Sequence, residues 1–395
     1  MSYLDKLLDG VKVEWKPLGE VSELDRGKTI TAKTKSAGNI PVISGGQTPA
    51  YYNSKFNRDG ETITIAGSGA YAGFVMYWNE PIFVSDAFSV KPNLSVLNTR
   101  YVFHFLLNNQ SWIHNLQKGS GVPHVYPKDL AKLEIPIPYP ENLEKSLEIQ
   151  KEIVRILDTF TELTAELTAE LTARKKQYNY YREELFNFDD KKVEHKPLGE
   201  IGEFQRGKRF VRTDITSDGV PCIHYGEMYT HYGTWANESK SFLSEELVDN
   251  KKLRVAEKGD IVIVAAGETI EDIGKGTAWL SNKGVVIHDA CFSYRSQLHP
   301  KYVAYFTRTK RFHDQIKKYI SSGKISAINA NGLSKAIIPI PSPEEQERIV
   351  AVLDKFDTLT ASISEGLPKE IELRQKQYEY YRDMLLTFPT DNIEA

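Results

Sequence analysis

The feature that most constrains this chain is a set of motifs that occurs twice in the same order. The paired segments are 15–20 and 195–200, 135–138 and 338–341, and 174–182 and 374–382. The first pair shares Lys-Pro-Leu-Gly-Glu, the second Ile-Pro-Ile-Pro, and the third Arg-x-Lys-Gln-Tyr-x-Tyr-Tyr-Arg. The period is far longer than the roughly 20–50 residues of solenoid repeats. We therefore expect two domain-sized halves built on one plan.

The bulk composition narrows the class of protein. A chain of 395 residues is long enough for two or three domains, each with its own core. No run approaches the roughly 18 apolar residues of a membrane-spanning helix, and the first residues do not form a signal peptide. Cys222 and Cys291 lack metal-ligand spacing, as is typical of free thiols in a reducing compartment. We expect a cytoplasmic protein.

The charge distribution is uneven along the chain. The net charge of −3 mildly disfavours a nucleic-acid binder. Basic residues nevertheless gather locally, in residues 308–324 and in residues 206–212, where no acidic residue interrupts them. A basic face on an acidic protein is compatible with contacts to phosphate groups. A single cluster of basic residues is nevertheless more often just a solvated part of the surface.

Each half is expected to contain a mixed domain followed by a long helix. Residues 13–145 and 191–343 carry short β-like runs broken by Gly and Asn turns. Helical patterns are expected near their ends, over 101–116 and 302–319. The Ile-Pro-Ile-Pro strand that follows should be an edge strand, because proline cannot donate to a ladder. This is an α+β pattern.

The segments 146–190 and 344–388 space their apolar residues alternately by three and four. This pattern predicts a pair of long antiparallel coiled-coil-like helices that separate the two domains. The predicted seam includes Leu163, Leu167, Leu171, Phe356, Leu359 and Ile363. Pro368 should restart or kink the second helix. Residues 1–12 resemble the end of the repeated helical region and should complete it beside the C-terminal part, and 389–395 form a tail.

The first helix contains a tandem tetrapeptide. Thr164-Ala165-Glu166-Leu167 is followed at once by Thr168-Ala169-Glu170-Leu171. Four helical residues add about 6 Å and about 400° of rotation, a net turn of roughly 40°. One base pair of DNA turns by roughly 35°. If the two domains bind DNA, gain or loss of one tetrapeptide would therefore rotate one domain relative to the other by about one base-pair step. The plainer alternative is that the repeat is a neutral helical filler.

Together these features resemble the specificity subunit of type I restriction–modification enzymes, and most closely the subfamily with tandem Thr-Ala-Glu-Leu repeats. The resemblance covers nearly all 395 residues. It implies that each mixed domain is a target-recognition domain that reads one half of an asymmetric bipartite site in double-stranded DNA. The helices would set the gap and dock two modification subunits, which are adenine methyltransferases. Restriction subunits with translocase and endonuclease activity would join that complex in phage defence.

The resemblance implies a non-catalytic chain, with S-adenosylmethionine, ATP and Mg held by the partner subunits. The residues agree, because no Asn-Pro-Pro-aromatic tetrad and no nuclease acid–acid–lysine cluster occurs. Gly27-Lys28-Thr29 lacks the first glycine of a phosphate-binding loop, since Ser22 stands there. The nine histidines do not pair with acids or cysteines at metal-ligand spacings. A self-contained methyltransferase or nuclease is therefore disfavoured.

Candidate DNA contacts follow from residue type and from differences between the copies, because the halves of an asymmetric site differ. Gln47 and Glu227 lie in matching loops, and their side chains suit adenine and cytosine edges in the major groove. In the next loop we align Ser68 and Tyr71 with Glu268 and Thr269. The predicted contacts are Arg26, Lys28, Gln47, Ser68, Tyr71, Lys118, Ser120, His124, Arg206, Lys208, Arg209, Arg212, Tyr225, Glu227, Glu268 and Lys324. The basic residues suit phosphate, and for every residue a surface turn without a DNA role remains the alternative.

A protein-interaction scaffold that does not bind DNA is the rival hypothesis. The acidic net charge and the helical seam favour it. The basic clusters and the tetrapeptide spacer count against it.

Overall fold

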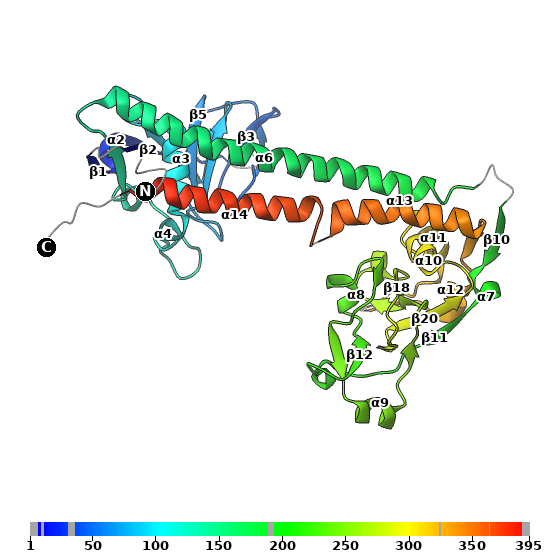
Figure 1. The fold of residues 1–395 in the computed structure, drawn as a ribbon. Helices are drawn as coiled ribbons and strands as arrows, with labels where there is room; N and C mark the ends of the chain where they lie inside the picture. Colours follow the sequence, from blue (N-terminus) through cyan, green and yellow to red (C-terminus); the bar gives the residue numbers. More distant parts are fainter. Residues whose placement is uncertain are drawn as a thin grey trace. The chain divides into compact units, whose positions relative to one another are not determined.

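The structure is a computed structural model that describes residues 7–8, 12–30, 36–188, 193–323, 325–362 and 364–388 (Figure 1). It divides into two compact units. Unit 1 comprises Met1–Thr168 with Glu370–Ala395, and unit 2 comprises Ala169–Lys369. Each unit holds one mixed domain and a stretch of the long helices. Within the described ranges, no helix is both long and apolar enough to cross a membrane.

The mixed domain of unit 1 contains two main sheets, with strand orders β2-β8-β5-β6 and β4-β3-β7. Its strands are β1 (Val13–Pro17), β2 (Ser22–Arg26), β3 (Ile40–Ile43), β4 (Tyr51–Asn53), β5 (Glu61–Ala66), β6 (Val75–Asn79), β7 (Phe83–Val84), β8 (Ala87–Pro92) and β9 (Glu134–Pro138). Its short helices are α2 (Leu18–Val21), α3 (Thr99–Asn108), α4 (Gln110–His114) and α5 (Pro127–Leu130).

The mixed domain of unit 2 repeats this topology, with orders β11-β20-β16-β18-β13 and β14-β12-β19-β15. Its strands are β10 (Glu194–Pro197), β11 (Gly202–Arg206), β12 (Val220–Ile223), β13 (Trp235–Ala236), β14 (Ser241–Leu243), β15 (Val255–Ala256), β16 (Ile261–Val264), β17 (Ala266–Gly267), β18 (Gly276–Trp279), β19 (Val285–Ile287), β20 (Cys291–Ser296), β21 (Ser326–Ala327) and β22 (Ile337–Ile340). Its helices are α7 (Leu198–Ile201), α8 (Glu227–Thr230), α9 (Glu245–Lys251), α10 (Pro300–Phe306), α11 (Lys310–Ile316) and α12 (Ala330–Ser334), with short 3₁₀ turns η1 (Arg212–Asp214), η2 (Ile270–Asp272) and η3 (Lys317–Tyr319).

Each mixed domain is closed by a two-stranded ribbon at its chain ends. In unit 1 β1 pairs with β9, and in unit 2 β10 pairs with β22, both antiparallel. The proline strand thus has a single partner, as expected of a strand whose prolines cannot donate. The duplicated Leu18 and Leu198 are fully buried after these ribbons. The glycine that follows each leucine is packed closely, since a Cβ on Gly19 would lie 2.9 Å from that of Ala131.

The helical patterns expected over 101–116 and 302–319 are present, and each is divided into successive helices. In unit 1 α3 ends at Asn108 and α4 begins at Gln110. In unit 2 the hydroxyl of Thr309 accepts a hydrogen bond from the backbone N–H of Phe312 (3.1 Å) and caps a new helix, α11. A capping threonine offers the backbone an alternative to continuing the helix.

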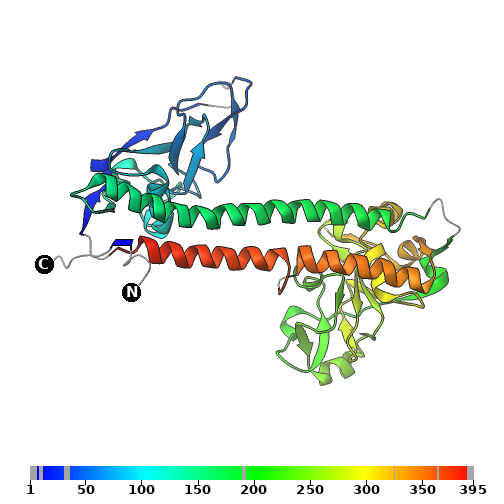
Figure 2. The ribbon, with the colours of Figure 1, turned by 45° about the horizontal axis from the view of Figure 1, so that its top comes forward.

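The spacer helices match the heptad pattern. Helix α6 (Leu143–Glu184) is uninterrupted, whereas its antiparallel counterpart is divided into α13 (Pro343–Ala361) and α14 (Leu367–Leu386) (Figures 1 and 2). Helix α14 restarts at Leu367–Pro368 after Gly366, which has a φ of 82°. The expected α+β fold with two similar mixed domains and long antiparallel helices is confirmed.

Aromatic rings join the helices within each unit. In unit 1 Phe160 stacks on Tyr381 at 5.0 Å between centroids. In unit 2 Phe356 stacks on both Tyr178 (5.8 Å) and Tyr181 (5.7 Å). The predicted seam residues Leu163, Leu167, Leu171, Phe356 and Leu359 are half-buried, and Ile363 lies outside the described residues. Tyr178, Tyr181 and Tyr381 of the repeated motif therefore contribute to helix packing.

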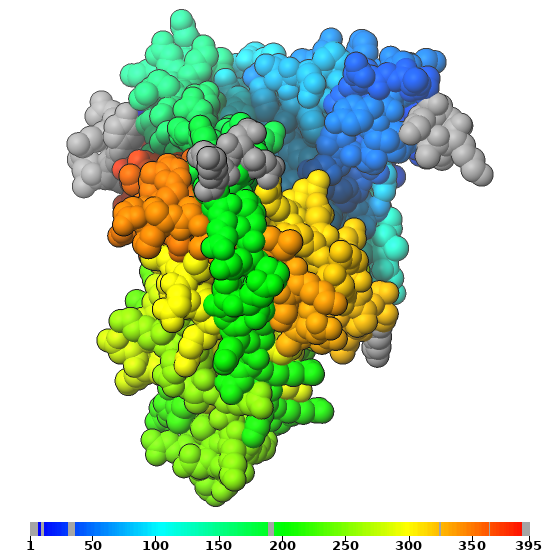
Figure 3. All heavy atoms as spheres, turned by 90° about the vertical axis from the view of Figure 1, so that its right-hand side faces the viewer, coloured from blue at the N-terminus to red at the C-terminus, as the bar shows by residue number. Residues whose placement is uncertain are grey.

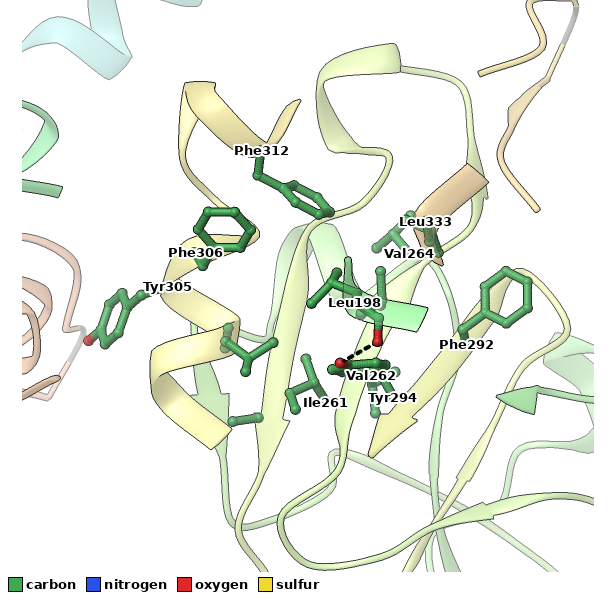
Figure 4. Close-up of a cluster of buried hydrophobic side chains, with 14 of the residues drawn as sticks. Leu198, Ile261, Val262, Val264, Phe292, Tyr294, Tyr305, Phe306, Phe312 and Leu333 are labelled. Atoms are coloured by element: carbon green, nitrogen blue, oxygen red, sulfur yellow. Dashed lines mark hydrogen bonds between the residues drawn. The ribbon is translucent and has the colours of Figure 1, made fainter. Parts of the chain in front are cut away.

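The two cores follow the same plan. In unit 2 Phe186, at the end of α6, lies fully buried against Tyr302 (4.8 Å) and Phe306 (5.5 Å). Figure 4 shows this core, where the Tyr294 hydroxyl donates to the Leu198 carbonyl (3.0 Å). In unit 1 the corresponding buried residues are Leu386 and Phe388, which share a cluster with Leu8. Residues 1–6 and 9–11 of the expected N-terminal segment lie outside the described ranges.

A buried glutamine ties each mixed domain to its long helix. In unit 1 the Gln150 side chain accepts from the backbone N–H of Asn98 (2.8 Å) and donates to the carbonyl of Val96 (2.9 Å). In unit 2 Gln346 accepts from the N–H of His299 (2.9 Å) and donates to the carbonyl of Pro341 (2.9 Å). Each glutamine amide thus supplies hydrogen-bond partners to two backbone groups, one of which belongs to the residue that precedes helix α3 or α10.

Candidate nucleic-acid interface

In unit 2 the predicted contacts gather around one pocket of about 410 Å³. The predicted residues that line it are Arg206, Arg209, Arg212, Tyr225 and Glu268. All five are exposed. The domain that carries them forms one continuous packed body, coloured green to yellow in the space-filling view of Figure 3. Sequence segments that are far apart therefore converge on one concave, cationic surface.

The Arg-Gly-Lys turn beside this surface (residues 206–208, and 26–28 in the first copy) is packed closely against the neighbouring backbone, and we call it the Arg-Gly-Lys joint. Gly207 donates its N–H to the carbonyl of Cys291 (3.0 Å), and a Cβ on Gly207 would lie 2.2 Å from the carbonyl oxygen of His288. In the first copy Gly27 donates to the carbonyl of Ala87 (2.9 Å), and its Cβ would lie 2.2 Å from the carbonyl oxygen of Ser85. Only glycine fits such an approach. The duplicated turn thus fixes the backbone beside an exposed arginine.

The arginine of each turn is placed by contacts within its own domain. Arg206 donates from Nε to the carbonyl of Asp289 (2.9 Å). The Arg26 guanidinium lies 5.7 Å from the ring centroid of Tyr126, within reach of a cation–π interaction. Both arginines remain exposed. Their free donors suit phosphate oxygens.

Aromatic rings form the floor of the unit 2 pocket. His288 lies 4.8 Å from His224, 5.1 Å from Phe210 and 5.2 Å from Tyr225, measured between ring centroids. Burial lowers the pKa of His224 and of His288 below the usual value, so both imidazoles are neutral at neutral pH. A neutral imidazole carries one donor and one acceptor. The pocket therefore combines fixed positive charge at Arg206 with groups that can read a base edge.

The two histidines were missed as site residues, together with Ile325, which also lines the pocket. The sequence held a signal for His288, because Ser85-Asp86-Ala87 is echoed by His288-Asp289-Ala290 beside the Arg-Gly-Lys joint. For His224 the sequence held none.

In unit 1 a hairpin brings several predicted residues together. Lys118 and His124 exchange two backbone hydrogen bonds, each of 2.9 Å. Ser68 forms a β-bridge to His124, and the neighbouring Gly69 N–H donates to the carbonyl of Pro123 (3.0 Å). The His124 ring stacks on Tyr126 at 6.1 Å, the same ring that Arg26 covers. The structure therefore gathers Arg26, Ser68, Lys118 and His124 in one region.

The other predicted residues are less closely tied to that region. Lys28, Gln47, Tyr71 and Ser120 are exposed. The loop of Gln47 runs beside the loop of Ser68, because a Cβ on Gly45 would lie 2.3 Å from the Ser68 carbonyl oxygen. Lys324 lies outside the described residues.

Several predicted side chains already have partners inside their domain. The Ser68 hydroxyl donates to Asp86, and Lys118 pairs with Asp129 (2.7 Å). Lys208 donates from Nζ to the carbonyl of Lys251 (3.4 Å). The Glu227 carboxylate accepts from the N–H of His224 (2.9 Å) and from the Ser241 hydroxyl. Glu227 thus stabilises its own turn, and a base contact would require it to give up these bonds.

The structure revises one alignment between the copies. Val125 donates its N–H to the carbonyl of Gly67 (3.1 Å), as Ile328 does to that of Ala265 (2.9 Å). Gly67 and Ala265 are therefore equivalent, which places Ser68 opposite Ala266. The alignment of Ser68 with Glu268 was therefore wrong by two residues, because the copies lie 180 residues apart at Gly27 and Gly207 but 198 residues apart at Gly67 and Ala265, and no shared motif marks where the extra residues fall.

The described residues give no sign of a metal centre. Among them, no group of three or more His, Cys, Asp or Glu side chains is arranged to hold a metal ion. Cys222 and Cys291 are buried free thiols, and burial raises the pKa of each to about 12.

The chain is similar to known proteins over nearly its whole length. It matches the family model for the type I restriction modification DNA specificity domain twice, over residues 11–174 and 190–373. It is 35% identical to the type I restriction enzyme EcoR124I/EcoR124II specificity subunit of Escherichia coli, over 98% of each chain. It is 33% identical to a putative type I restriction enzyme specificity subunit, S.HindORF215P, of Haemophilus influenzae, again over 98% of each.

Solved structures show the same fold. The type I restriction-modification S subunit from M. genitalium superposes with a TM-score of 0.60 at 17% identity, over 97% of this chain and 98% of that one. The two matches of the family model coincide with the two halves that carry the duplicated joints and hairpins. The chain belongs to the family of type I restriction-modification DNA specificity subunits.

Proposed function

We propose that this chain is the DNA-reading subunit of a type I restriction–modification complex, and that each mixed domain reads one half of an asymmetric bipartite site. The observation that carries the proposal is one structural frame built twice with different exposed residues. The Arg-Gly-Lys joint and the neighbouring hairpin recur in both units, whereas exposed Lys118 stands where the second copy has Ser321. Two similar frames with different side chains suit two different half-sites.

The exposed arginines and lysines are the proposed phosphate contacts, because phosphate contacts position a protein while base contacts specify the sequence. In unit 2 these are Arg206, Arg209 and Arg212, around the pocket. Tyr225 and Glu268 on the same pocket are the proposed base contacts. In unit 1 Gln47, Tyr71 and the 118–124 hairpin have that role.

The helices are the proposed spacer and docking platform. Helix α6 runs without a break through both Thr-Ala-Glu-Leu units, which supports membership of the subfamily with such repeats. The repeated Tyr180 and Tyr380 are 61% and 65% exposed on their helices. We assign to these faces two modification methyltransferase subunits, through which the restriction subunits join. S-adenosylmethionine, ATP and Mg belong to those partners, and this chain is not catalytic.

The segment boundaries form part of the proposal. Residues 13–145 and 191–343 are the recognition domains. Residues 146–190 and 344–388 are the spacers.

Methylation profiling of the host genome, with this gene intact and deleted, tests the function. Deletion should remove one bipartite motif that is methylated on adenine in both strands. Retention of every methylated motif, in cells that express the neighbouring methyltransferase, would contradict the proposal.

An exchange of residues 191–343 for those of another family member is the matched test of the division of labour. It should change one half-site only, and the reciprocal exchange of residues 13–145 should change the other. A change in both halves, or in neither, would overturn the assignment of one half-site to each domain.

A further inference from the structure

Each recognition domain exposes one branched aliphatic side chain near the tip of a short hairpin. Val122 is 54% exposed in unit 1 and Ile325 is 63% exposed in unit 2. The hairpins are formed by the same bonding pattern, since Lys118 bridges to His124 and Ser321 bridges to Ala327. Both bridges enclose the same number of residues. Val122 and Ile325 therefore occupy the same position in the two copies.

The rest of the two hairpins has diverged. The first reads Gly-Ser-Gly-Val-Pro between its bridge residues, and the second reads Ser-Gly-Lys-Ile-Ser. Only the branched aliphatic position keeps its chemical character. A single exposed apolar side chain needs no explanation. Two exposed aliphatic side chains at the same position of otherwise different polar loops do need an explanation, because neither side chain is needed to fill a core.

The hairpins are held by their backbones and not by these side chains. Ser321 donates to the carbonyl of Ala327 (2.9 Å), and Ala327 donates back (3.1 Å), as Lys118 and His124 do in the first copy. The second hairpin also pairs with β17 through β21. Each tip is thus a fixed support that presents one apolar group outward.

Both tips lie in the candidate interface of their own unit. Ile325 lines the unit 2 pocket together with Arg206 and Arg209. Val122 is followed by Pro123, whose carbonyl is bonded to Gly69, and by His124, which bridges to Ser68. An apolar group set among phosphate-binding cations suits the inside of a DNA groove.

We propose that Val122 and Ile325 are specificity-determining contacts, and that each touches the C5-methyl group of a thymine in its own half-site. The inference rests on the proposed function. The thymine methyl is the apolar feature of the major groove, and aliphatic side chains read it by contact. The major groove is about 12 Å wide and admits a two-stranded ribbon, as a hairpin tip requires.

The test uses the chain assembled with its methyltransferase subunits and a duplex that carries the methylated site. Each thymine of the two half-sites is replaced in turn by deoxyuridine, which removes only the methyl group. One replacement in each half-site should weaken wild-type binding about fourfold, the effect of uncovering one methyl. This measurement needs no variant.

The variants Val122→Ser and Ile325→Ser complete a double-mutant cycle, because serine keeps no methyl group that could contact the thymine methyl. Val122→Ser should weaken binding to the thymine duplex and abolish the response to deoxyuridine in one half-site, while the other half-site keeps its response. Ile325→Ser should do the reverse. Leu94→Ser is the matched control, because Leu94 is 66% exposed in the turn after β8 and outside the interface, and its response should equal that of the wild type.

Additive losses, with the deoxyuridine response intact in both variants, would overturn the proposal. If the variants bend DNA less and no deoxyuridine replacement affects binding, Val122 and Ile325 would instead insert between stacked bases. That result would also overturn the proposal. If the wild-type complex binds no bipartite site at all, the proposed function itself fails.

Discussion

Replacing Gln150 with leucine should destabilise unit 1 and leave unit 2 unchanged. The side chain is fully buried, and it satisfies the N–H of Asn98 and the carbonyl of Val96. Leucine has a similar volume but no polar atom, so both backbone groups would lose their partner. A group left without its partner costs about 1–3 kcal/mol when buried. Both groups are half-buried here, so the lower end applies and the total is about 2 kcal/mol.

Calorimetric unfolding of the full chain measures this effect. For a unit of about 200 residues, 2 kcal/mol corresponds to a fall in Tm of roughly 4–8 °C. Gln346→Leu should lower the transition of unit 2 in the same way, because Gln346 bonds His299 and Pro341. Lys151→Ala, on the exposed side of α6, is the control. A Gln150→Leu chain that melts like the control, or in which both transitions fall equally, would refute the reasoning.

Three further predictions concern spacing, salt and pH. Deletion of Thr168–Leu171 should change the gap of the methylated motif and leave both half-sites intact, as genome methylation profiling would show; an unchanged gap would refute the spacer role. Replacing Arg209 and Arg212 with glutamine should weaken DNA binding and reduce the slope of log K against log salt by about 0.9 for each lost phosphate contact, in titrations at several salt concentrations. Burial lowers the pKa of His104, whose ring is hydrogen-bonded to Asp158 and Tyr378 and lies near Arg100 and Arg382. The neutral imidazole therefore stabilises unit 1 fully above about pH 6.5, and this contribution is lost as the pH falls through the lower pKa of the folded state. His104→Gln should flatten that part of the unfolding free energy against pH, and a wild-type unit 1 equally stable at pH 7 and pH 5 would count against this assignment.

The sequence predicted the parts of the molecule that depend on local pattern. The heptad spacing gives α6 directly, and Pro368 marks the restart of α14. The duplicated Lys-Pro-Leu-Gly motif is explained by a buried leucine and a closely packed glycine. The breaks at Asn109 and Thr309 escaped prediction, because the apolar pattern continues past both positions; at Thr309 the capping hydroxyl competes with that pattern.

The site was less predictable than the fold. Residue type alone made Arg206 and Arg209 candidates, but the pocket that they line together with Tyr225 and Glu268 depends on long-range strand pairing. Loop alignment was off by two residues at Ser68, since insertions fall in loops where no motif fixes the register. Exposed Ile325 gave no signal until the hairpins could be superposed by their hydrogen bonds.

The ribbon formed by β1 and β9 has an evolutionary consequence. It places the entry and the exit of a recognition domain on neighbouring, hydrogen-bonded strands, in register from Val13 to Pro17. A segment exchanged between Pro17 and Glu134 would therefore be joined to the rest of the chain by one strand pair, provided that it keeps the contacts of Val96 and Asn98 with Gln150. The second copy has the same ribbon and the same type of contact, between His299 and Gln346, so the same condition applies to an exchange there.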